Sequence, residues 1–181
     1  ILKNIVRTSY PVIKATIPYN TNKYTHNSTL LNYYSPGERT FEGKYKCAST
    51  SMVLGIYLQN KGYPIKYHYF KEDKTGGIKD HLYIRCDDVI IDPTYRQFFT
   101  SHSNYNNNYL KYLYCGQPYC FYGTNNEFKN YYSDLQSRHY QEYNYNLRPD
   151  TLKYWLYSKE VDLIGPNQLL KKEIETVLET L

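Results

Sequence analysis

The stretch from residue 48 to residue 92 constrains the fold most, because its apolar residues change from a helical to a strand-like period. Helical spacing comes first and ends at Asn60-Lys61-Gly62, a typical helix stop. The apolar residues that recur at this spacing are Ala48, Met52, Val53, Ile56 and Tyr57. We therefore expect a helix that begins near Ala48 and ends at Asn60.

Three short β-favouring segments follow this helix. They span Ile65 to Phe70, His81 to Cys86 and Val89 to Asp92, and a glycine-containing loop from Lys71 to Lys79 separates the first two. Asp87-Asp88 stands between the last two segments and favours a tight turn. The sequence therefore predicts an α+β fold in which a helix precedes an antiparallel sheet.

The rest of the chain adds elements at both ends of this region. The first forty residues, with β-favouring pieces such as Val12 to Ile17, are expected to form a strand or two and long loops. Leu110 to Phe121 is expected to be another strand or a buried strand pair, whereas residues 124–150 show no clear pattern. Apolar residues at helical spacing predict an amphipathic helix over about 167–181, packed on the same domain. A chain of 181 residues suits a single domain, 1–181.

The charge and hydropathy of the chain argue against two classes of partner, nucleic acid and membrane. The net charge of +5 arises from 22 Lys and Arg against 17 Asp and Glu, and the basic residues are scattered. The 25 tyrosines could stack on bases, but without a basic patch we expect them in the core, and no nucleic acid as partner. No apolar run approaches the ~20 residues that span a bilayer, so we expect no membrane partner.

The four cysteines, Cys47, Cys86, Cys115 and Cys120, favour a reducing compartment, because a chain of this length does not need disulfides for stability. We expect the cytoplasm, or the host cytosol for a viral or effector protein. Ile1 in place of Met leaves a processed, secreted product open. Cys115 and Cys120 lack a second ligand pair at zinc-like spacing, which predicts no metal site. A disulfide between them and two free thiols remain alternatives.

Cys47 is the first candidate for chemistry, because it stands at the start of the predicted helix. The unpaired backbone N–H groups and the positive dipole end of a helix stabilise a thiolate there. Lys44 and Lys46 add positive charge, and the small residues 48–51 leave room for a substrate carbonyl. A cysteine in this place also serves commonly as a small packing residue. Cys47 alone therefore does not define a site.

The predicted hairpin brings His81 and Asp92 together. If Asp87-Asp88 forms a two-residue loop, Cys86 pairs with Val89 and His81 becomes the diagonal neighbour of Asp92 on one face. A slip by one residue would separate the two side chains. The acid would accept the imidazole N–H, so that the other ring nitrogen takes and returns the thiol proton. None of the other histidines has an acid at a comparable hairpin position.

Four segments carry these residues in a characteristic order: Gly43-x-x-x-Cys47, Asn60-Lys61-Gly62-Tyr63-Pro64-Ile65, Asp80-His81-Leu82-Tyr83-Ile84 and Val89-Ile90-Ile91-Asp92-Pro93-Thr94. This order resembles the core of the transglutaminase-like superfamily of papain-like folds. In that family a cysteine opens the core helix, a histidine begins the second strand and an Asp-Pro-Thr sequence ends the third. The resemblance covers about residues 43–98. It departs from the family at Tyr83, where Trp is common, and in the short spacing from His81 to Asp92.

The resemblance implies a papain-like core in which the Cys47 helix packs on an antiparallel sheet, with extra N- and C-terminal elements. It also implies a catalytic Cys47-His81-Asp92 triad that needs no metal or cofactor. The implied chemistry is acyl transfer on a protein or peptide amide through a thioester. Transglutaminase, glutamine deamidase and cysteine peptidase activities all fit this chemistry.

Two further features of the site are predicted from the residues around the triad. Tyr83, Tyr95 and Gln97 lie close to the triad in the sequence and are candidate substrate-binding residues. The backbone N–H of Cys47, with a second donor that the sequence does not identify, is expected to stabilise the oxyanion. The alternative function is a catalytically inactive, tyrosine-rich domain that binds a protein or a glycan.

Overall fold

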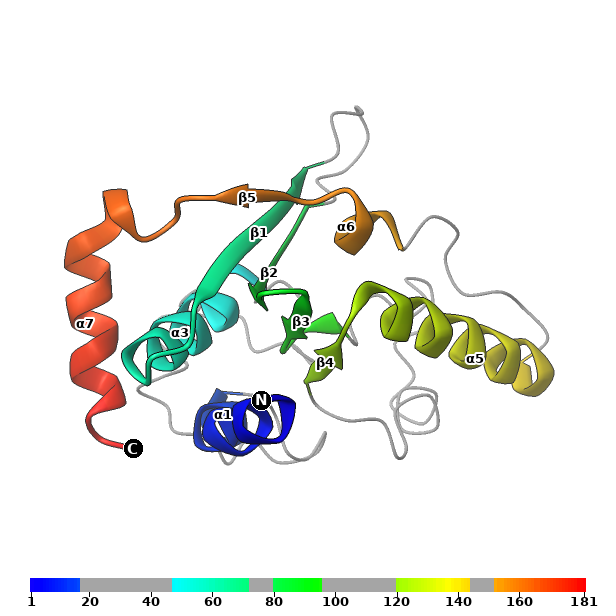
Figure 1. The fold of residues 1–181 in the computed structure, drawn as a ribbon, viewed down its shortest axis with the longest axis horizontal. Helices are drawn as coiled ribbons and strands as arrows, with labels where there is room; N and C mark the ends of the chain where they lie inside the picture. The colour runs from blue at the N-terminus through cyan, green and yellow to red at the C-terminus, as the bar shows by residue number, and fades with distance from the viewer. Residues whose placement is uncertain (17–46, 72–79, 96–119, 144–151) are drawn as a thin grey trace.

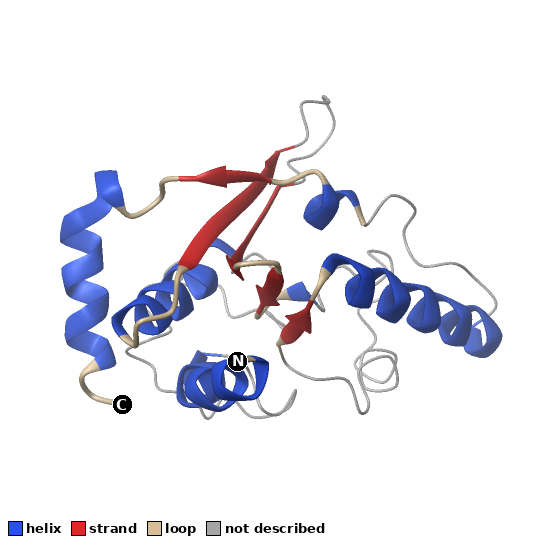
Figure 2. Ribbon diagram, in the orientation of Figure 1, coloured by secondary structure: helices blue, strands red, loops and turns tan. Residues whose placement is uncertain are grey.

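The computed structural model describes residues 1–16, 47–71, 80–95, 120–143 and 152–181 (Figure 1). Within these residues the helices are α1 (Leu2–Thr16), α3 (Cys47–Asn60), α5 (Asn125–Tyr143), α6 (Lys153–Leu156) and α7 (Gln168–Leu178), with a 3-10 turn η3 (Gly165–Asn167) before α7. The strands are β1 (Ile65–Lys71), β2 (Asp80–Cys86), β3 (Val89–Asp92), β4 (Phe121–Gly123) and β5 (Lys159–Val161). Figure 2 shows these strands between groups of helices, which is an α+β arrangement.

The strands form one antiparallel sheet in the order β4-β3-β2-β1-β5. β3 follows β2 through the turn at Asp87-Asp88, and Cys86 pairs with Val89. Asp87 has a φ of 53°, a left-handed conformation that Asp tolerates better than most residues. The structure therefore confirms the predicted hairpin with its predicted register, and it confirms the α+β class.

Alternate residues of the strands enter two different cores, because both faces of the sheet are covered. On β2, Leu82 and Ile84 enter the core beneath α3, whereas Tyr83 enters a core on the opposite face. Helices α1 and α7 complete the α3 side (Figure 1). The buried residues of this first core include Ile5, Val12, Val53, Leu54, Ile56, Leu58, Ile65, Tyr67, Leu82, Ile84, Ile91, Ile174 and Val177.

The second core is mainly aromatic and is covered by α5 and α6. Its buried residues are Tyr83, Ile90, Tyr95, Phe121, Phe128, Tyr132, Tyr154 and Trp155. Pairs of rings meet edge to face, as in Phe121 and Phe128, whose centroids lie 4.6 Å apart. In the described part of the chain, several tyrosines therefore act as core residues, as the sequence predicted.

The close packing of α3 on β1 determines where Cys47 lies. A Cβ atom added to Gly55 would lie 2.4 Å from the Tyr67 hydroxyl oxygen, so the helix approaches the strand at this glycine. The Tyr67 hydroxyl also donates a hydrogen bond of 3.5 Å to the Met52 carbonyl. Because β1 returns along α3 after the turn at Gly62, the N-terminus of α3 lies near the end of β1 and the start of β2. Cys47 therefore begins its helix beside His81.

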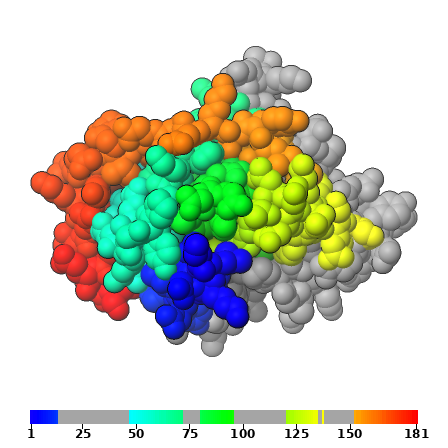
Figure 3. Space-filling view, in the orientation of Figure 1, coloured from blue at the N-terminus to red at the C-terminus, as the bar shows by residue number. Residues whose placement is uncertain are grey.

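The prediction of strands and loops at the N-terminus was wrong for residues 2–16, which form α1. The buried residues Ile5, Ser9, Val12 and Ile13 recur at helical spacing and face the first core. Burial of this stripe against α3 outweighs the strand propensity of the β-branched residues. Figure 3 shows α1 below α3 on the viewed face, where it covers part of the domain.

The C-terminal helix was predicted correctly, since α7 buries Ile174, Val177 and Leu178 in the first core.

Helix α5 lies in the region where the sequence shows no clear pattern, but the residues at its start indicate a helix. The Thr124 hydroxyl accepts from the Glu127 N–H at 3.2 Å, and the Glu127 carboxylate accepts from the Thr124 N–H at 2.9 Å. This reciprocal pair is a capping box, which begins a helix.

Several predictions fall outside the described residues. They concern Gln97, Cys115 and most of the proposed strand at Leu110 to Phe121, of which the structure describes only Cys120 and Phe121, the first residue of β4. Among the described helices, none combines the length and the apolar character that crossing a membrane requires.

Candidate active site

Cys47 is the first residue of α3, and its side chain is partly exposed. The N–H groups of the first helical turn have no partner within the helix, so they point toward the space around this residue. Together with the helix dipole they favour negative charge at the sulfur and at a substrate oxygen beside it. Cys47 is therefore placed as a reachable thiol in an electropositive setting.

His81 and Asp92 meet on one face of the hairpin. The His81 Nε2 atom lies 2.6 Å from the Asp92 Oδ2 atom, and both side chains have 0 % exposure. His81 is the second residue of β2 and Asp92 is the last residue of β3, so the register of the hairpin brings them together. A short hydrogen bond between charged groups in a water-free setting fixes the ring orientation.

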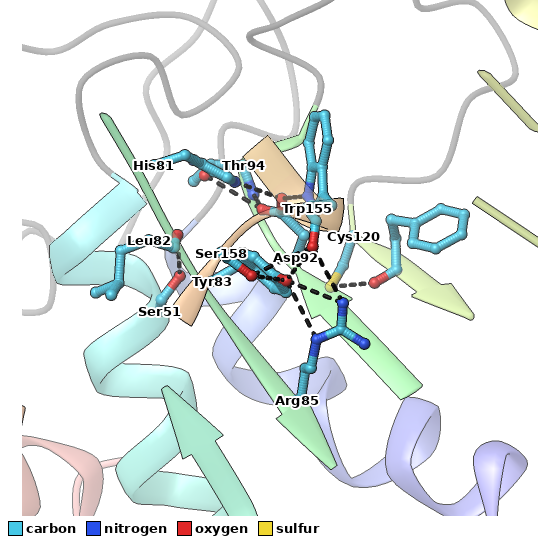
Figure 4. A network of polar contacts seen from close by, with 11 residues as sticks. Ser51, His81, Leu82, Tyr83, Arg85, Asp92, Thr94, Cys120, Trp155 and Ser158 are labelled. Atoms are coloured by element: carbon cyan, nitrogen blue, oxygen red, sulfur yellow. Dashed lines mark hydrogen bonds and ion pairs between the residues drawn. The ribbon is translucent and has the colours of Figure 1, made fainter. Parts of the chain in front are cut away.

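Both oxygens of Asp92 have further partners (Figure 4). Oδ1 accepts from the Thr94 N–H at 2.9 Å and from the Thr94 hydroxyl at 3.4 Å. Oδ2 accepts from the Trp155 Nε1–H at 2.6 Å, in addition to its bond with His81. This set of donors satisfies a buried carboxylate and leaves it one orientation. Asp92 is therefore suited to hold His81 in place.

The His81 imidazole is poised to carry a proton. Burial lowers its pKa, but the charge of Asp92, the hydrogen bond to Asp92 and the side chain of Cys47 together raise the pKa to about 9. Because Nε2 is bonded to Asp92, Nδ1 is the ring nitrogen that remains to interact with Cys47. At neutral pH the imidazole is therefore protonated, and its positive charge lies close to Cys47.

A hydrogen bond between α3 and β2 connects the helix that carries Cys47 to the strand that carries His81. The Ser51 hydroxyl, one turn after Cys47, donates to the carbonyl of Leu82 at 3.1 Å. Leu82 directly follows His81 in β2, and the Ser51 side chain is fully buried. The bond therefore fixes the position of the start of α3, and with it Cys47, relative to the His81 imidazole.

Replacement of Ser51 by alanine is expected to slow alkylation of Cys47 by iodoacetamide about tenfold, because a small displacement of the thiol weakens its contact with His81. It is also expected to lower the free energy of unfolding by about 1 kcal/mol, the usual effect of losing one buried hydrogen bond. Alkylation rates and urea unfolding check the two effects. Ser49→Ala is the matched control, since residue 49 points away from residue 47 on a helix. Equal alkylation rates for both variants would contradict a positioning role.

Tyr69 and Asp80 form a second polar pair near the thiol, which sequence reasoning did not identify. The Tyr69 hydroxyl donates to the Asp80 Oδ2 atom at 2.6 Å. This hydrogen bond, burial, and the nearby charges of Asp80 and Cys47 raise the pKa of Tyr69 to about 12. Asp80 thus holds a neutral tyrosine on the α3 side of the sheet.

The structure gives two of the three candidate substrate-binding residues a packing role. Tyr83 and Tyr95 are fully buried in the aromatic core. The Tyr83 hydroxyl donates to the Trp155 carbonyl at 2.9 Å, and the Tyr95 hydroxyl bonds the Tyr131 hydroxyl at 3.1 Å. Their side chains face the protein interior, so they pack beneath the site instead of contacting a substrate. Gln97 lies outside the described residues.

The other described cysteines differ from Cys47 in exposure. Cys86 and Cys120 are buried and have free thiols. Burial, and for Cys86 the nearby charge of Asp87, raises the pKa of both thiols. A buried thiol with a raised pKa is a poor nucleophile. Among the described residues no group of three or more His, Cys, Asp and Glu side chains could hold a metal ion.

Trp155 is the residue of the candidate site that sequence reasoning missed most clearly. It lies 63 positions after Asp92 in the sequence and reaches the carboxylate from α6. No local motif marks this contact, because it depends on how the C-terminal segment returns over the sheet. The one available signal was that Trp155 is the only tryptophan of the chain.

Comparison with models of protein families, with curated proteins and with solved structures finds no match for this chain.

Proposed function

We propose that the chain is a thiol-dependent acyl-transfer enzyme with Cys47 as nucleophile, His81 as general acid and base and Asp92 as the residue that orients His81. The fold that we propose for this core is the transglutaminase-like variant of the papain-like fold. The observation that carries the proposal is the buried 2.6 Å bond between His81 and Asp92, with the other ring nitrogen left for Cys47. A partly exposed thiol opposite a fully buried base supports it.

The reaction begins with attack of the Cys47 thiolate on the carbonyl carbon of an amide. A C–S bond forms and the carbonyl electron pair moves to oxygen, where the N–H groups at the start of α3 stabilise the negative charge. When the carbonyl re-forms, the C–N bond breaks and the departing nitrogen takes the proton from His81 Nδ1. The product of this half is an acyl thioester on Cys47 and a free amine or ammonia.

The second half releases the acyl group. Neutral His81 removes a proton from water or from an amine, which attacks the thioester carbon. The C–S bond then breaks, so the thiolate and the imidazolium are restored. Water gives hydrolysis or deamidation, and an amine gives transamidation. We propose a protein or peptide as the substrate and a reducing compartment as the setting, since three free thiols are present in the described residues.

Incubation with β-casein, a flexible protein rich in glutamine, separates the possible activities by mass spectrometry. Deamidation replaces NH2 by OH at glutamine, transamidation adds a supplied primary amine such as dansylcadaverine, and proteolysis yields fragments. Any of these products, lost in the Cys47→Ala protein, supports the proposal. Equal product from the wild type and from Cys47→Ala would refute it.

The pH dependence of acyl-enzyme formation is expected to follow His81. The imidazolium supplies the proton for the departing nitrogen, so the rate should fall as pH rises through about 9, where His81 loses this proton. Measurement of the rate of thioester formation across pH, with a p-nitroanilide or amide probe, checks this. A rate that rises steadily through pH 9 would contradict the assignment of His81 as the acid.

Stability should change with pH in the same direction. The pKa of His81 is raised from 6.5 to about 9 in the folded protein. Its contribution to stability is therefore fully present below pH 6.5 and is lost as pH rises through about 9. Urea unfolding between these values should show a decrease on the order of 1 to 3 kcal/mol, given 1.4 kcal/mol per pKa unit. His81→Gln is the control, in which this decrease should disappear.

A further inference from the structure

We infer that Trp155 is a positioning residue for the His81–Asp92 pair, and that Arg85 and Tyr83 on β2 hold Trp155 in place (Figure 4). This inference rests on the proposed function. It adds the C-terminal segment around α6 to the site. This segment lies outside the region that resembles the family core.

The side chain of Trp155 contacts the acid and the base together. Its Nε1–H donates to the same Asp92 oxygen that bonds His81, and both distances are 2.6 Å. Its ring meets the His81 ring edge to face at a centroid distance of 5.4 Å. Trp155 has 1 % exposure, so the indole also keeps water away from the hydrogen bond.

The backbone of Trp155 is anchored separately. Its carbonyl accepts from the Tyr83 hydroxyl at 2.9 Å, from the Ser158 hydroxyl at 3.2 Å and from Arg85 Nη2 at 3.3 Å. α6 has only four residues and is too short to fix its own orientation. The three donors therefore fix the backbone position from which the indole extends.

Arg85 connects this anchor to two other elements. Its Nε and Nη2 atoms donate to the Tyr83 hydroxyl at 3.1 and 3.0 Å, and Nη2 also donates to the Asn125 side-chain oxygen at 2.7 Å. The planar guanidinium can serve these acceptors together, which a lysine ammonium cannot do in the same geometry. Arg85 therefore ties β2, the start of α5 and α6 into one support.

Tyr83 also contacts the His81 ring. Its ring stacks on the His81 ring with a centroid distance of 5.8 Å and an angle of 18°. The His81 ring thus contacts both the Tyr83 ring and the Trp155 indole, and the polar cluster around the Trp155 carbonyl holds both of these aromatic residues. Loss of Arg85 or of the indole N–H should loosen the pair without removing any catalytic group.

The test uses Trp155→Phe, which keeps a ring and removes the N–H donor, and Arg85→Met, which acts from the partly exposed end of the cluster. Proton NMR of the full chain detects the His81 Nε2–H resonance, which in the wild type should lie far downfield and exchange slowly with water. Both variants should show upfield movement and faster exchange. Alkylation of Cys47 by iodoacetamide at neutral pH should fall about tenfold in Trp155→Phe and less in Arg85→Met.

Arg85→Lys is expected to restore part of both signals, because lysine keeps one charged donor. Tyr157→Ala, at the exposed end of α6, is the control and should leave both unchanged. An unchanged Nε2–H signal in folded Trp155→Phe and Arg85→Met would overturn the inference. The proposed function fails separately if wild type modifies no amide while the Nε2–H signal behaves as expected. If Trp155→Phe does not fold, Arg85→Met alone decides.

Discussion

Replacement of Cys47 by alanine is expected to abolish amide modification of β-casein and to leave the fold intact. The thiolate forms the only covalent bond between enzyme and substrate in the proposed reaction, so no other group can take its place. The side chain is partly exposed at the start of α3, and its loss removes little packing. Mass spectrometry of the casein products and thermal unfolding by circular dichroism measure the two effects.

Cys86→Ala is the matched control for this experiment. It removes a thiol from the end of β2, in the first core and away from the His81–Asp92 pair. Its expected effect is a loss of stability of about 1 kcal/mol for the small cavity, with activity preserved. Activity that depended equally on both cysteines would point to a general structural effect and would contradict the assignment of Cys47 as nucleophile.

Replacement of Asp92 by asparagine is expected to lower the rate of acyl-enzyme formation by about 10² to 10⁴ fold. Asparagine has nearly the same shape, but it lacks the charge that raises the pKa of His81. The imidazole would then lose its proton near neutral pH, and the thiolate would lose its partner. The rate of thioester formation and an NMR titration of His81 measure these changes.

Asp88→Asn provides the same chemical change in the exposed turn of the same hairpin. It should leave both the rate and the His81 titration as in the wild type. If Asp92→Asn also kept the wild-type rate, Asp92 would be a structural acid, and the catalytic site could not be the one proposed.

Local patterns were sufficient to predict the part of the site that lies within one hairpin. The Asp87-Asp88 turn and the alternation of the two strands define the register, and the register places His81 beside Asp92. Helical spacing after Cys47 likewise located α3. These predictions succeeded because the contacts involved connect residues close in sequence or within one regular element.

The missed features depend on contacts between distant segments. β-branched residues near Val12 indicated a strand, but the segment is helical because the buried face of α1, which includes Ile5, packs on α3. Because Tyr83 stands close to His81 in the sequence, it was expected to contact the substrate. In the structure the aromatic core beneath α5 and α6 buries it. Trp155 reaches Asp92 only because α6 returns over the sheet. The periodicity of a sequence does not show which helix will cover which face of the sheet.

Competitive alkylation of the native protein tests the central claim most directly. Limiting iodoacetamide at neutral pH, followed by unfolding, labelling of the remaining thiols with a heavy reagent and peptide mass spectrometry, gives the relative reactivity of each cysteine. We predict that Cys47 is modified well before Cys86 and Cys120, and that His81→Ala removes this preference. Modification of Cys47 at the rate of an ordinary thiol, unchanged by loss of His81, would contradict a catalytic thiol at this site.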